Sequence, residues 1–415
     1  MSGVGATTAL DAAAGIRWDV LIVGAGPAGG AAALRLARHG LRVIVIDRGS
    51  LPRGKLCGCC LSSAAVAELR GLAIPGGGPL ARAVPLRRIR LAAAGRIACI
   101  AASGGATVSR ETLDTELLAA AVAAGAQWLP WTAAVASDDR AGPEPTAVVT
   151  VRDQCGTART ARLECRRLLV ATGLGETVRL AGGSEAGAAA AVAPASRIGI
   201  GAVLPAAGAA VEPGTLLMAV ATCGYCGIVR LEDGRIDVAA AVDRAALVAG
   251  TPGAVLRRIV ADACGGTAAA TWLAGLDAAT IRATPALTRS SPVVAGAGRN
   301  VLRVGDAAGY VEPFTGEGMG WALAAARLAA AALVDARTGT LRPAAVAAAA
   351  YEREHAGCFR HPHARCRRVA AGLRHPGLVR AAVRAARLAP WAARLAVPVM
   401  TGGLSAVRGR AGGAA

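Results

Sequence analysis

The feature that most constrains the fold is the stretch from residue 19 to residue 47, which has the pattern strand, glycine turn, helix, strand. The apolar run at 20–23 is rich in branched residues, as is typical of a strand buried on both faces. A G-x-G-x-x-G turn follows it, and a second apolar run at 43–46 ends in an acidic residue. This order predicts an α/β fold with a Rossmann-like parallel sheet.

The same stretch indicates a dinucleotide site. Its glycines allow a sharp turn, a close approach of a pyrophosphate to bare backbone, and tight packing of helix on strand. The helix N-terminus turns unpaired N–H groups toward the phosphates. An acid after the second strand can accept hydrogen bonds from both ribose hydroxyls, which favours the unphosphorylated ribose of FAD or NAD. The predicted contacts are Gly24, Gly26, Pro27, Ala28, Gly29, Asp47 and Arg48.

A third predicted buried strand, at 300–304, favours FAD over NAD, because it is followed by Gly305-Asp306. A carboxylate at that strand end can hold the ribityl hydroxyls of an extended flavin dinucleotide. The residues that follow predict a turn shaped to admit the flavin ring, and then a long helix over 317–336 whose N-terminus would stabilise negative charge on reduced flavin. They are Pro313, Gly316, Glu317, Gly318 and Met319.

The segment GDAAGYVEPFTGEGMGWAL resembles the third flavin motif of the geranylgeranyl reductases and related flavin-dependent dehydrogenases. RGKLCGCCLSS, SRETLDTELL and LLVATG resemble three further segments of that family. The resemblance implies the fold of p-hydroxybenzoate hydroxylase, bound FAD, and an electron donor that is NAD(P)H or a reduced carrier. It also implies flavin contacts at Lys55, Cys57, Gly58, Arg110, Ala171, Thr172 and Gly173.

We expect two domains and a C-terminal region in the 415 residues. A discontinuous FAD-binding domain would comprise 17–75, 105–180 and 285–336. An antiparallel-sheet substrate domain would comprise 76–104 and 181–284, with loosely alternating strands at 86–100 and a hairpin over 222–240 that turns at 232–234. Residues 337–415 would form a basic helical region.

The cysteines and histidines leave several possibilities open. Cys57 and Cys60 have C-x-x-C spacing, as do Cys223 and Cys226, which permits zinc or a dithiol relay to flavin. We favour no metal, because neither pair has the setting of a zinc knuckle and cysteine is a common small core residue. The cluster Cys358, His361, His363 and Cys366 is interpreted as a solvated segment, because a proline and arginines interrupt it.

Composition bears on location and partners. We find no span of about 20 apolar residues and no signal peptide, and eleven irregularly spaced cysteines suit reduced thiols in a cytoplasm. The net charge of +19 comes almost wholly from arginine. Basic residues interleaved with aromatics are missing, so we expect no nucleic-acid partner.

The tail supplies one further candidate partner. No acidic residue follows Glu354, and Arg380, Arg384, Arg387 and Arg394 recur at helical spacing. This pattern predicts either a peripheral helix on an anionic inner-membrane surface or a helix packed on the flavin domain with its arginines in water.

The leading hypothesis is an FAD-dependent oxidoreductase that reduces carbon–carbon double bonds of an apolar, isoprenoid or lipid-like substrate. A hydride would come from reduced flavin, and Cys57 would supply or relay the proton. The alternative is an FAD-dependent monooxygenase acting through a flavin hydroperoxide, although Thr172 replaces the aspartate of the aromatic hydroxylases. A flavin-bound sensor without turnover is the non-enzymatic possibility.

Overall fold

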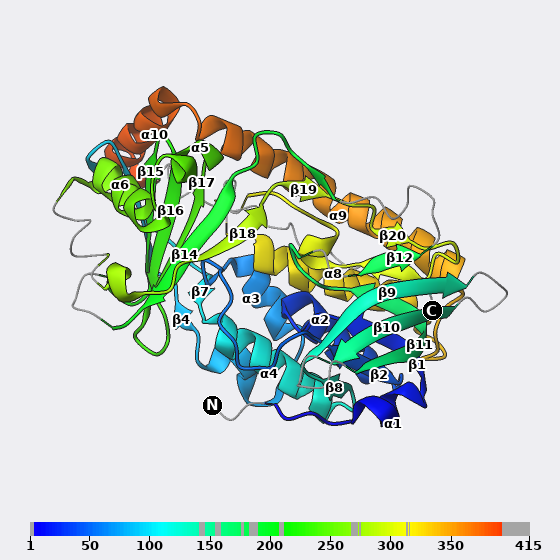
Figure 1. Ribbon diagram of the computed structural model, residues 1–415. Helices are drawn as coiled ribbons and strands as arrows, with labels where there is room; N and C mark the ends of the chain where they lie inside the picture. Colours follow the sequence, from blue (N-terminus) through cyan, green and yellow to red (C-terminus); the bar gives the residue numbers. More distant parts are fainter. Residues whose placement is uncertain are drawn as a thin grey trace, which may run out of the picture.

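The computed structural model describes residues 4–140, 146–153, 159–175, 178–181, 190–206, 211–266, 273, 275–312, 314 and 316–391. Two sheets define two domains that lie side by side (Figure 1). The long helix α9 (Ala344–Gly372) runs from the first domain toward the second, and α10 (Pro376–Leu388) follows it there.

The first sheet is mainly parallel and is centred on the predicted strand–turn–helix–strand unit. Val23 lies opposite Ile46 on one side and Val170 on the other, so three strands end together at the glycine turn. An antiparallel pair extends the sheet beyond β11. Its strands are β1 (Arg17–Val23), β2 (Val43–Ile46), β8 (Gln127–Leu129), β9 (Thr132–Arg140), β10 (Thr146–Asp153), β11 (Thr160–Val170), β12 (Arg179–Ala181), β20 (Val294–Ala295) and β21 (Val301–Arg303).

Helices α2 (Pro27–Ala37), α4 (Arg110–Ala123) and α8 (Gly318–Leu333) cover one face of this sheet (Figure 1). Small residues allow them to approach closely: a methyl group added at Gly30 of α2 would lie 3.1 Å from Cβ of Leu117 in α4. The short α1 (Leu10–Ala14) packs with the opposite face. The predicted Rossmann-like domain is confirmed, including the helices after residues 110 and 317.

The second sheet is antiparallel except where β5 pairs with β15. Helix α6 (Pro252–Cys264) covers one face, and the other turns toward the first domain. The predicted hairpin is present as β16 and β17, with its turn at Leu231–Arg235. The strands, in spatial order, are β18 (Arg282–Ala286), β14 (Ile198–Leu204), β17 (Ile236–Val242), β16 (Gly224–Arg230), β15 (Thr215–Ala221), β5 (Arg88–Ala93) and β6 (Arg96–Ala101).

Short elements connect the domains. Two three-stranded sheets lie outside the large ones, and a helix after Ser62 packs on α8. These elements are β3 (Cys60–Leu61), α3 (Ser63–Arg70), η1 (Pro75–Ala81), β4 (Val84–Pro85), β7 (Ala106–Thr107), β13 (Ala191–Val192), α5 (Arg244–Val248), η3 (Leu276–Ala278), β19 (Arg289–Ser290), η4 (Gly305–Ala307) and β22 (Gly309–Tyr310).

Two interpretations of the C-terminal region are wrong. The segment 358–366 is solvated on one side only: it lies within α9, which continues through Pro362, and Phe359 and Cys366 are buried whereas His361 is exposed. Helix α10 does not pack on the flavin domain. Its buried residues Val379 and Val383 instead join the apolar cluster on the second sheet, where α10 packs against β5 and β6.

Candidate flavin site

The glycine turn after β1 is shaped for a phosphate. A methyl group at Gly24 (φ +110°) would lie 2.4 Å from the carbonyl oxygen of Ala171, and one at Gly29 would lie 1.8 Å from that of Gly24. Both positions therefore demand glycine for the fold itself. At Gly26, the N-cap of α2, the added methyl would approach, among the described residues, only Nη2 of Arg110 at 3.5 Å. This helix N-terminus thus faces a guanidinium, which suits a pyrophosphate.

Asp47 lies at the end of β2, as the ribose contact requires, and is buried. Its carboxylate accepts hydrogen bonds from the backbone N–H groups of Ala25 (2.9 Å) and Gly49 (3.1 Å) and pairs with both terminal nitrogens of Arg53. Burial alone would raise the pKa of Asp47, but the Arg53 contacts and the two N–H groups hold it below its usual range. The predicted neighbour Arg48 is exposed instead.

Replacing Asp47 with alanine is expected to weaken FAD binding about 10- to 100-fold, since hydrogen bonds to a charged group contribute ~1.5–3 kcal/mol. Titration of apoprotein with FAD, followed by flavin fluorescence, measures the change. Asp277→Ala is the matched control, because that carboxylate is 90% exposed and pairs only at the surface with Arg257. If Asp47→Ala binds FAD with unchanged affinity, Asp47 does not contact the cofactor.

Arg110 is the first residue of α4 and is buried, with bonds of 2.6 and 3.0 Å to Asp114 one turn later. Desolvation opposes its charge, but Asp114 and then Cys57 raise the pKa of Arg110. Ser109 caps the helix, and its Oγ donates to Glu232 of the β16–β17 turn at 2.6 Å. The second domain thereby anchors the helix end that presents Arg110.

The loop before β3 brings Lys55 and Cys57 into the same place. Nζ of Lys55 lies 2.9 Å from the position of a methyl group on Gly173 (φ +70°), at the end of β11. Cys57 is half-buried, and a hydrogen bond with Cys59, followed by the charge of Arg110, lowers its pKa to about 6. Cys57 is therefore a thiolate-prone group beside the site.

We expect the alkylation rate of Cys57 to rise through about pH 6, because the lowered pKa populates the thiolate there rather than near the ordinary thiol value. Iodoacetamide labelling across pH, quantified by peptide mass spectrometry, measures this profile. Cys226 is the internal control, since burial raises its thiol pKa and it should stay unlabelled at neutral pH. A Cys57 midpoint near 9 would show that Arg110 and Cys59 do not activate it.

The Gly305-Asp306 turn meets the first glycine turn directly. A methyl group at Gly305 (φ +62°) would lie 3.0 Å from Cβ of Ala28 in the first turn of α2. Burial raises the pKa of Asp306 to about 6, against the opposing charges of Lys55 and Arg110. The structure thus gathers three sequence-distant signals around one space: the turn at 24–29, Lys55 with Arg110, and Asp306.

The residues preceding α8 are only partly covered. Pro313 lies outside the described residues. Gly316 has φ +69°, and a methyl group at Gly318 would lie 3.1 Å from the ring of Tyr310. Glu317 occupies the N-cap position of α8 without a side-chain capping bond and is buried: its Oε2 accepts from Ser62 at 3.3 Å, whereas Oε1 has no partner among the described residues. Burial raises the pKa of Glu317 to about 8.

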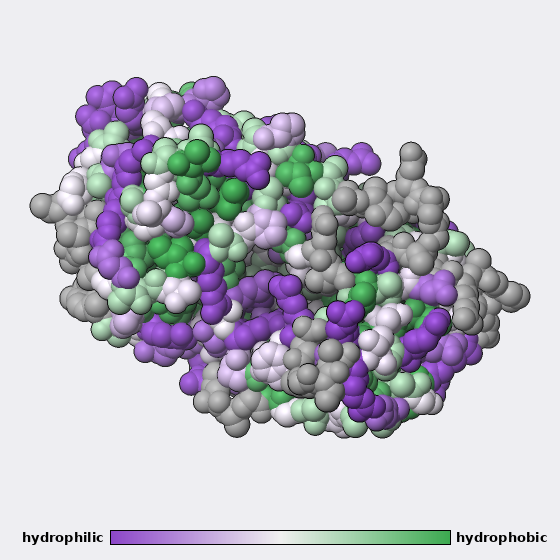
Figure 2. Space-filling view, in the orientation of Figure 1, coloured by the Kyte–Doolittle hydropathy of each residue, from purple (hydrophilic) through white to green (hydrophobic). Residues whose placement is uncertain are grey.

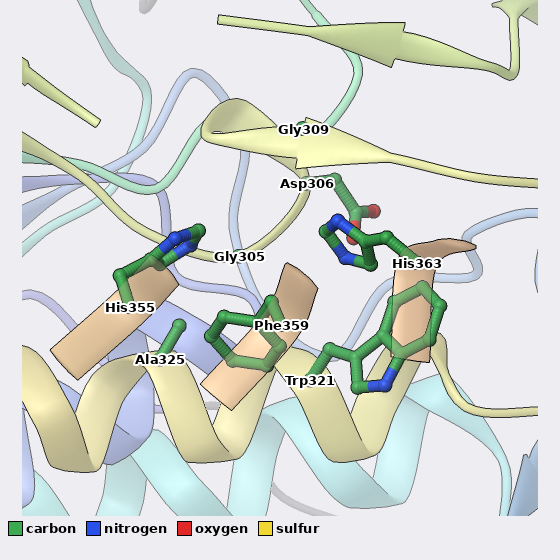
Figure 3. Close-up of a pocket in the computed structure, with 8 residues that line it drawn as sticks. All are labelled: Gly305, Asp306, Gly309, Trp321, Ala325, His355, Phe359 and His363. Atoms are coloured by element: carbon green, nitrogen blue, oxygen red, sulfur yellow. The ribbon is translucent and has the colours of Figure 1, made fainter. Parts of the chain in front are cut away.

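A small pocket beside Asp306 was missed by the sequence interpretation. Helix α9 contributes His355, Phe359 and His363, spaced four residues apart, and α8 contributes Trp321 and Ala325 from below (Figure 3). Burial lowers the pKa of both histidines to about 4, so they are neutral at physiological pH. The spacing of His355, Phe359 and His363 at i, i+4 and i+8 could have indicated that these three side chains share one face of a helix. Within the described part of the chain, no three His, Cys, Asp or Glu side chains group as a metal site requires.

These features fit FAD on the observations of this chain alone. A bare helix N-terminus at Gly26 faces Arg110, and two acids, the buried Asp47 and the half-buried Asp306, stand at two strand ends. The space between Gly26 and Arg110 is open because Gly26 has no side chain, and any larger residue there would fill it. When bound there, FAD would supply two-electron chemistry at its ring.

Comparison with known proteins points the same way. Residues 19–198 match the family described as FAD dependent oxidoreductase. A menaquinone reductase from Mycobacterium tuberculosis (strain CDC 1551 / Oshkosh) is 37% identical over 161 residues, which make up 37% of this chain and 37% of that protein. The chain therefore matches well under two thirds of this relative's length.

Solved structures extend the likeness to the whole fold. A flavoprotein/dehydrogenase from Cytophaga hutchinsonii has a TM-score of 0.72 at 16% identity and covers 93% of each chain. PqsL, a probable FAD-dependent monooxygenase from Pseudomonas aeruginosa, has a TM-score of 0.64 at 19% identity over 89% of this chain and 99% of its own. Residues 19–198 therefore resemble FAD dependent oxidoreductases, and the fold of the chain is one that a flavoprotein/dehydrogenase and a probable FAD-dependent monooxygenase share.

Proposed function

We propose that the protein uses bound FAD, reduced by NAD(P)H or a reduced carrier, to reduce a carbon–carbon double bond in an apolar, isoprenoid or other lipid-like substrate. The observation that carries the proposal is an apolar cluster, referred to below as the apolar wall, in which one face of the second sheet packs with residues of the flavin domain. On this face of the second sheet, Met218, Val220 and Tyr225 pack with Leu174 and Phe314 of the first domain. Such a wall favours an apolar substrate over a charged one.

Cys57 is the group proposed to supply or relay the proton; with a pKa of about 6 it is largely a thiolate at neutral pH, so it must take up a proton before each donation. A double bond that accepts hydride on one carbon requires a proton on the other, and a positioned acid typically contributes 10²- to 10⁴-fold. Cys57 packs against a separate small cluster of Cys59, Val229 and Leu231, and the charge of Arg110 stabilises the thiolate left after proton donation. The menaquinone reductase relative supports the class of substrate, since menaquinone is an apolar isoprenoid quinone.

A mass-spectrometric search for lipids that co-purify with the holoprotein tests the substrate class. We expect an unsaturated isoprenoid or similar lipid, absent from a matched preparation of Gly26→Val. Adding the identified lipid to reduced protein should reoxidise the flavin. A flavin that stays reduced with every such acceptor would instead support a binding or sensor module.

The monooxygenase alternative has one specific observation in its favour. The chain has only three tyrosines and two phenylalanines, and three of these five residues gather at the wall: Tyr225, Tyr310 and Phe314. The rings of Tyr225 and Phe314 meet edge to face at 5.0 Å. Such a pair can hold an aromatic substrate.

We also propose that the protein is cytoplasmic and docks on an anionic inner-membrane surface through α10. Its outer face exposes Arg380, Arg384 and Arg387, and Leu378 and Leu388 are 60% and 87% exposed. Hydrophilic residues occupy the upper left edge of the molecule in Figure 2, where Figure 1 places α10. Across the described residues, no helix is both long and apolar enough to cross a bilayer.

The position of α10 links this surface to the substrate. Val379, Val383 and Ala386 on its inner face belong to the same apolar cluster as Met218 and Tyr225. This buried cluster therefore joins the inner face of α10 to Leu174, Tyr310 and Phe314 of the first domain.

A further inference from the structure

Four charged side chains connect the C-terminal helices to the segment between Asp306 and α8. Arg374, between α9 and α10, donates a hydrogen bond to Asp243 at 2.8 Å. Asp243 follows β17 and also accepts from Nε of Arg197 at 3.1 Å, and Nη1 of Arg197 donates to Glu312 at 2.8 Å. Arg374, Asp243, Arg197 and Glu312 are referred to below as the ion-pair row.

The ion-pair row is buried at one end. The side chains of Arg197 and Glu312 are 0% and 2% exposed, whereas those of Asp243 and Arg374 are 29% and 32% exposed. The planar guanidinium of Arg197 bonds to two carboxylates at once, which fixes its direction as a compact ammonium would not. Removing both charges of a buried ion pair often costs little stability, so the pair is better explained by a required geometry.

Glu312 is held from two directions by adjacent residues. Its carboxylate accepts from Arg197, and its backbone N–H donates to Oγ1 of Thr288 at 3.4 Å. The N–H of Thr288 in turn donates to Oγ of Ser196 at 2.8 Å. Ser196 and Arg197 together therefore fix the place of Glu312.

The segment 305–312 extends this fixed point to the flavin site. It contains little regular structure: the turn η4, which includes Asp306, and the two-residue strand β22. Tyr310 of β22 pairs with Arg289 of β19, and the carbonyl of Ala308 accepts from the N–H of Ser291 at 3.2 Å. A segment with so few backbone bonds of its own depends on contacts such as those at Glu312 for its position.

We propose that Arg197, held in place by Asp243 and Arg374, is a positioning residue for bound FAD. By fixing Glu312 it sets where the Asp306 carboxylate stands relative to the ribityl chain. The guanidinium of Arg197 also lies 5.5 Å from the ring centroid of Tyr225, so the same side chain contacts the apolar wall. The inference goes beyond the proposed function, because it depends on bound FAD and not on the substrate.

The first test separates positioning from stability. The double variant Arg197→Met/Glu312→Leu removes both buried charges, so the apoprotein should keep a thermal midpoint close to that of the wild type. FAD affinity should nevertheless fall about 10-fold, and the visible absorption bands of the remaining bound flavin should shift, because Asp306 is displaced. Arg299→Met/Glu352→Leu removes a half-exposed pair before β21 and should change neither. Wild-type affinity and spectrum in Arg197→Met/Glu312→Leu would overturn the proposal.

The second test uses the half-exposed end of the ion-pair row and decides the case if the double variant does not fold. Arg374→Gln should weaken FAD binding about threefold, and its effect should not add to that of Glu312→Gln, because both changes act through Arg197. Arg384→Gln removes the same charge from the exposed face of α10 and should leave FAD affinity unchanged. Wild-type FAD affinity in Arg374→Gln, or additive losses, would show that the row does not set the flavin site.

Asp306→Asn distinguishes this inference from an error in the flavin site itself. We expect its FAD affinity to fall about 10-fold. If it does not fall, Asp306 does not contact FAD and the reason for positioning is lost. A loss in Asp306→Asn together with wild-type binding in the Arg197 and Arg374 variants refutes the positioning role alone. Protein that binds FAD as expected but reduces no lipid refutes the proposed function and leaves this inference intact.

Discussion

Gly26→Val is expected to give a folded but colourless protein. The added side chain would enter the space between the N-terminus of α2 and Arg110, where the nearest described atom to a new Cβ is 3.5 Å away. The protein can therefore accept the change, but a pyrophosphate in that space cannot. We expect FAD occupancy to fall at least 100-fold with little change in the thermal midpoint of the apoprotein.

Two further glycine variants make this test specific. Gly29→Ala should unfold or strongly destabilise the protein, because its methyl group would lie 1.8 Å from the backbone oxygen of Gly24. Gly357→Val on α9 should leave both folding and colour unchanged, since no described atom lies within 4 Å of the new Cβ. Absorbance of the flavin and circular dichroism together report the results. If Gly26→Val binds as much FAD as the wild-type protein, the pyrophosphate does not bind at this helix N-terminus.

Neutralising the outer face of α10 is expected to release the protein from anionic vesicles. Arg380, Arg384 and Arg387 are exposed, and each arginine near such a surface contributes about 1 kcal/mol. Replacing all three with glutamine should weaken binding about 100-fold at low salt while leaving FAD content intact. Co-sedimentation with vesicles of phosphatidylglycerol and phosphatidylcholine measures the partition.

The matched control removes the same charge elsewhere. The three control arginines have side chains that are at least 55% exposed. Arg159 lies just before β11, Arg162 lies on β11, and Arg353 lies on α9. Their replacement with glutamine should leave vesicle binding within a few-fold of wild type, because net charge alone does not set the contact. Wild-type protein that ignores anionic vesicles at low ionic strength, where screening is weakest, would refute the membrane proposal.

The parts of the fold that could be predicted are those specified by local physics. The glycines at 24 and 29 are required by contacts within one strand–turn–helix unit, so their spacing is visible in the sequence. The strands around them are buried on both faces and are therefore continuous apolar runs. Helices α4 and α8 likewise begin close to the predicted residues.

The parts that could not be predicted depend on how distant segments meet. Arg53 pairs with Asp47 only because the following loop folds back on β2, and Cys59 meets Val229 only because the second sheet packs on that loop. Neither pairing has a spacing that marks it. Pro362 misled the interpretation of 358–366, because proline in a helix usually breaks it, whereas the buried side chains on either side hold α9 together.

The most direct test of the central claim is a single turnover of chemically reduced holoenzyme with an unsaturated isoprenoid lipid such as menaquinone, under argon and in air with labelled oxygen. We expect product under argon, heavier by two hydrogens and free of label, and a step at least 100-fold slower in Cys57→Ala that retains its FAD. Product that forms only in air and carries the label would contradict the reductase and establish the monooxygenase.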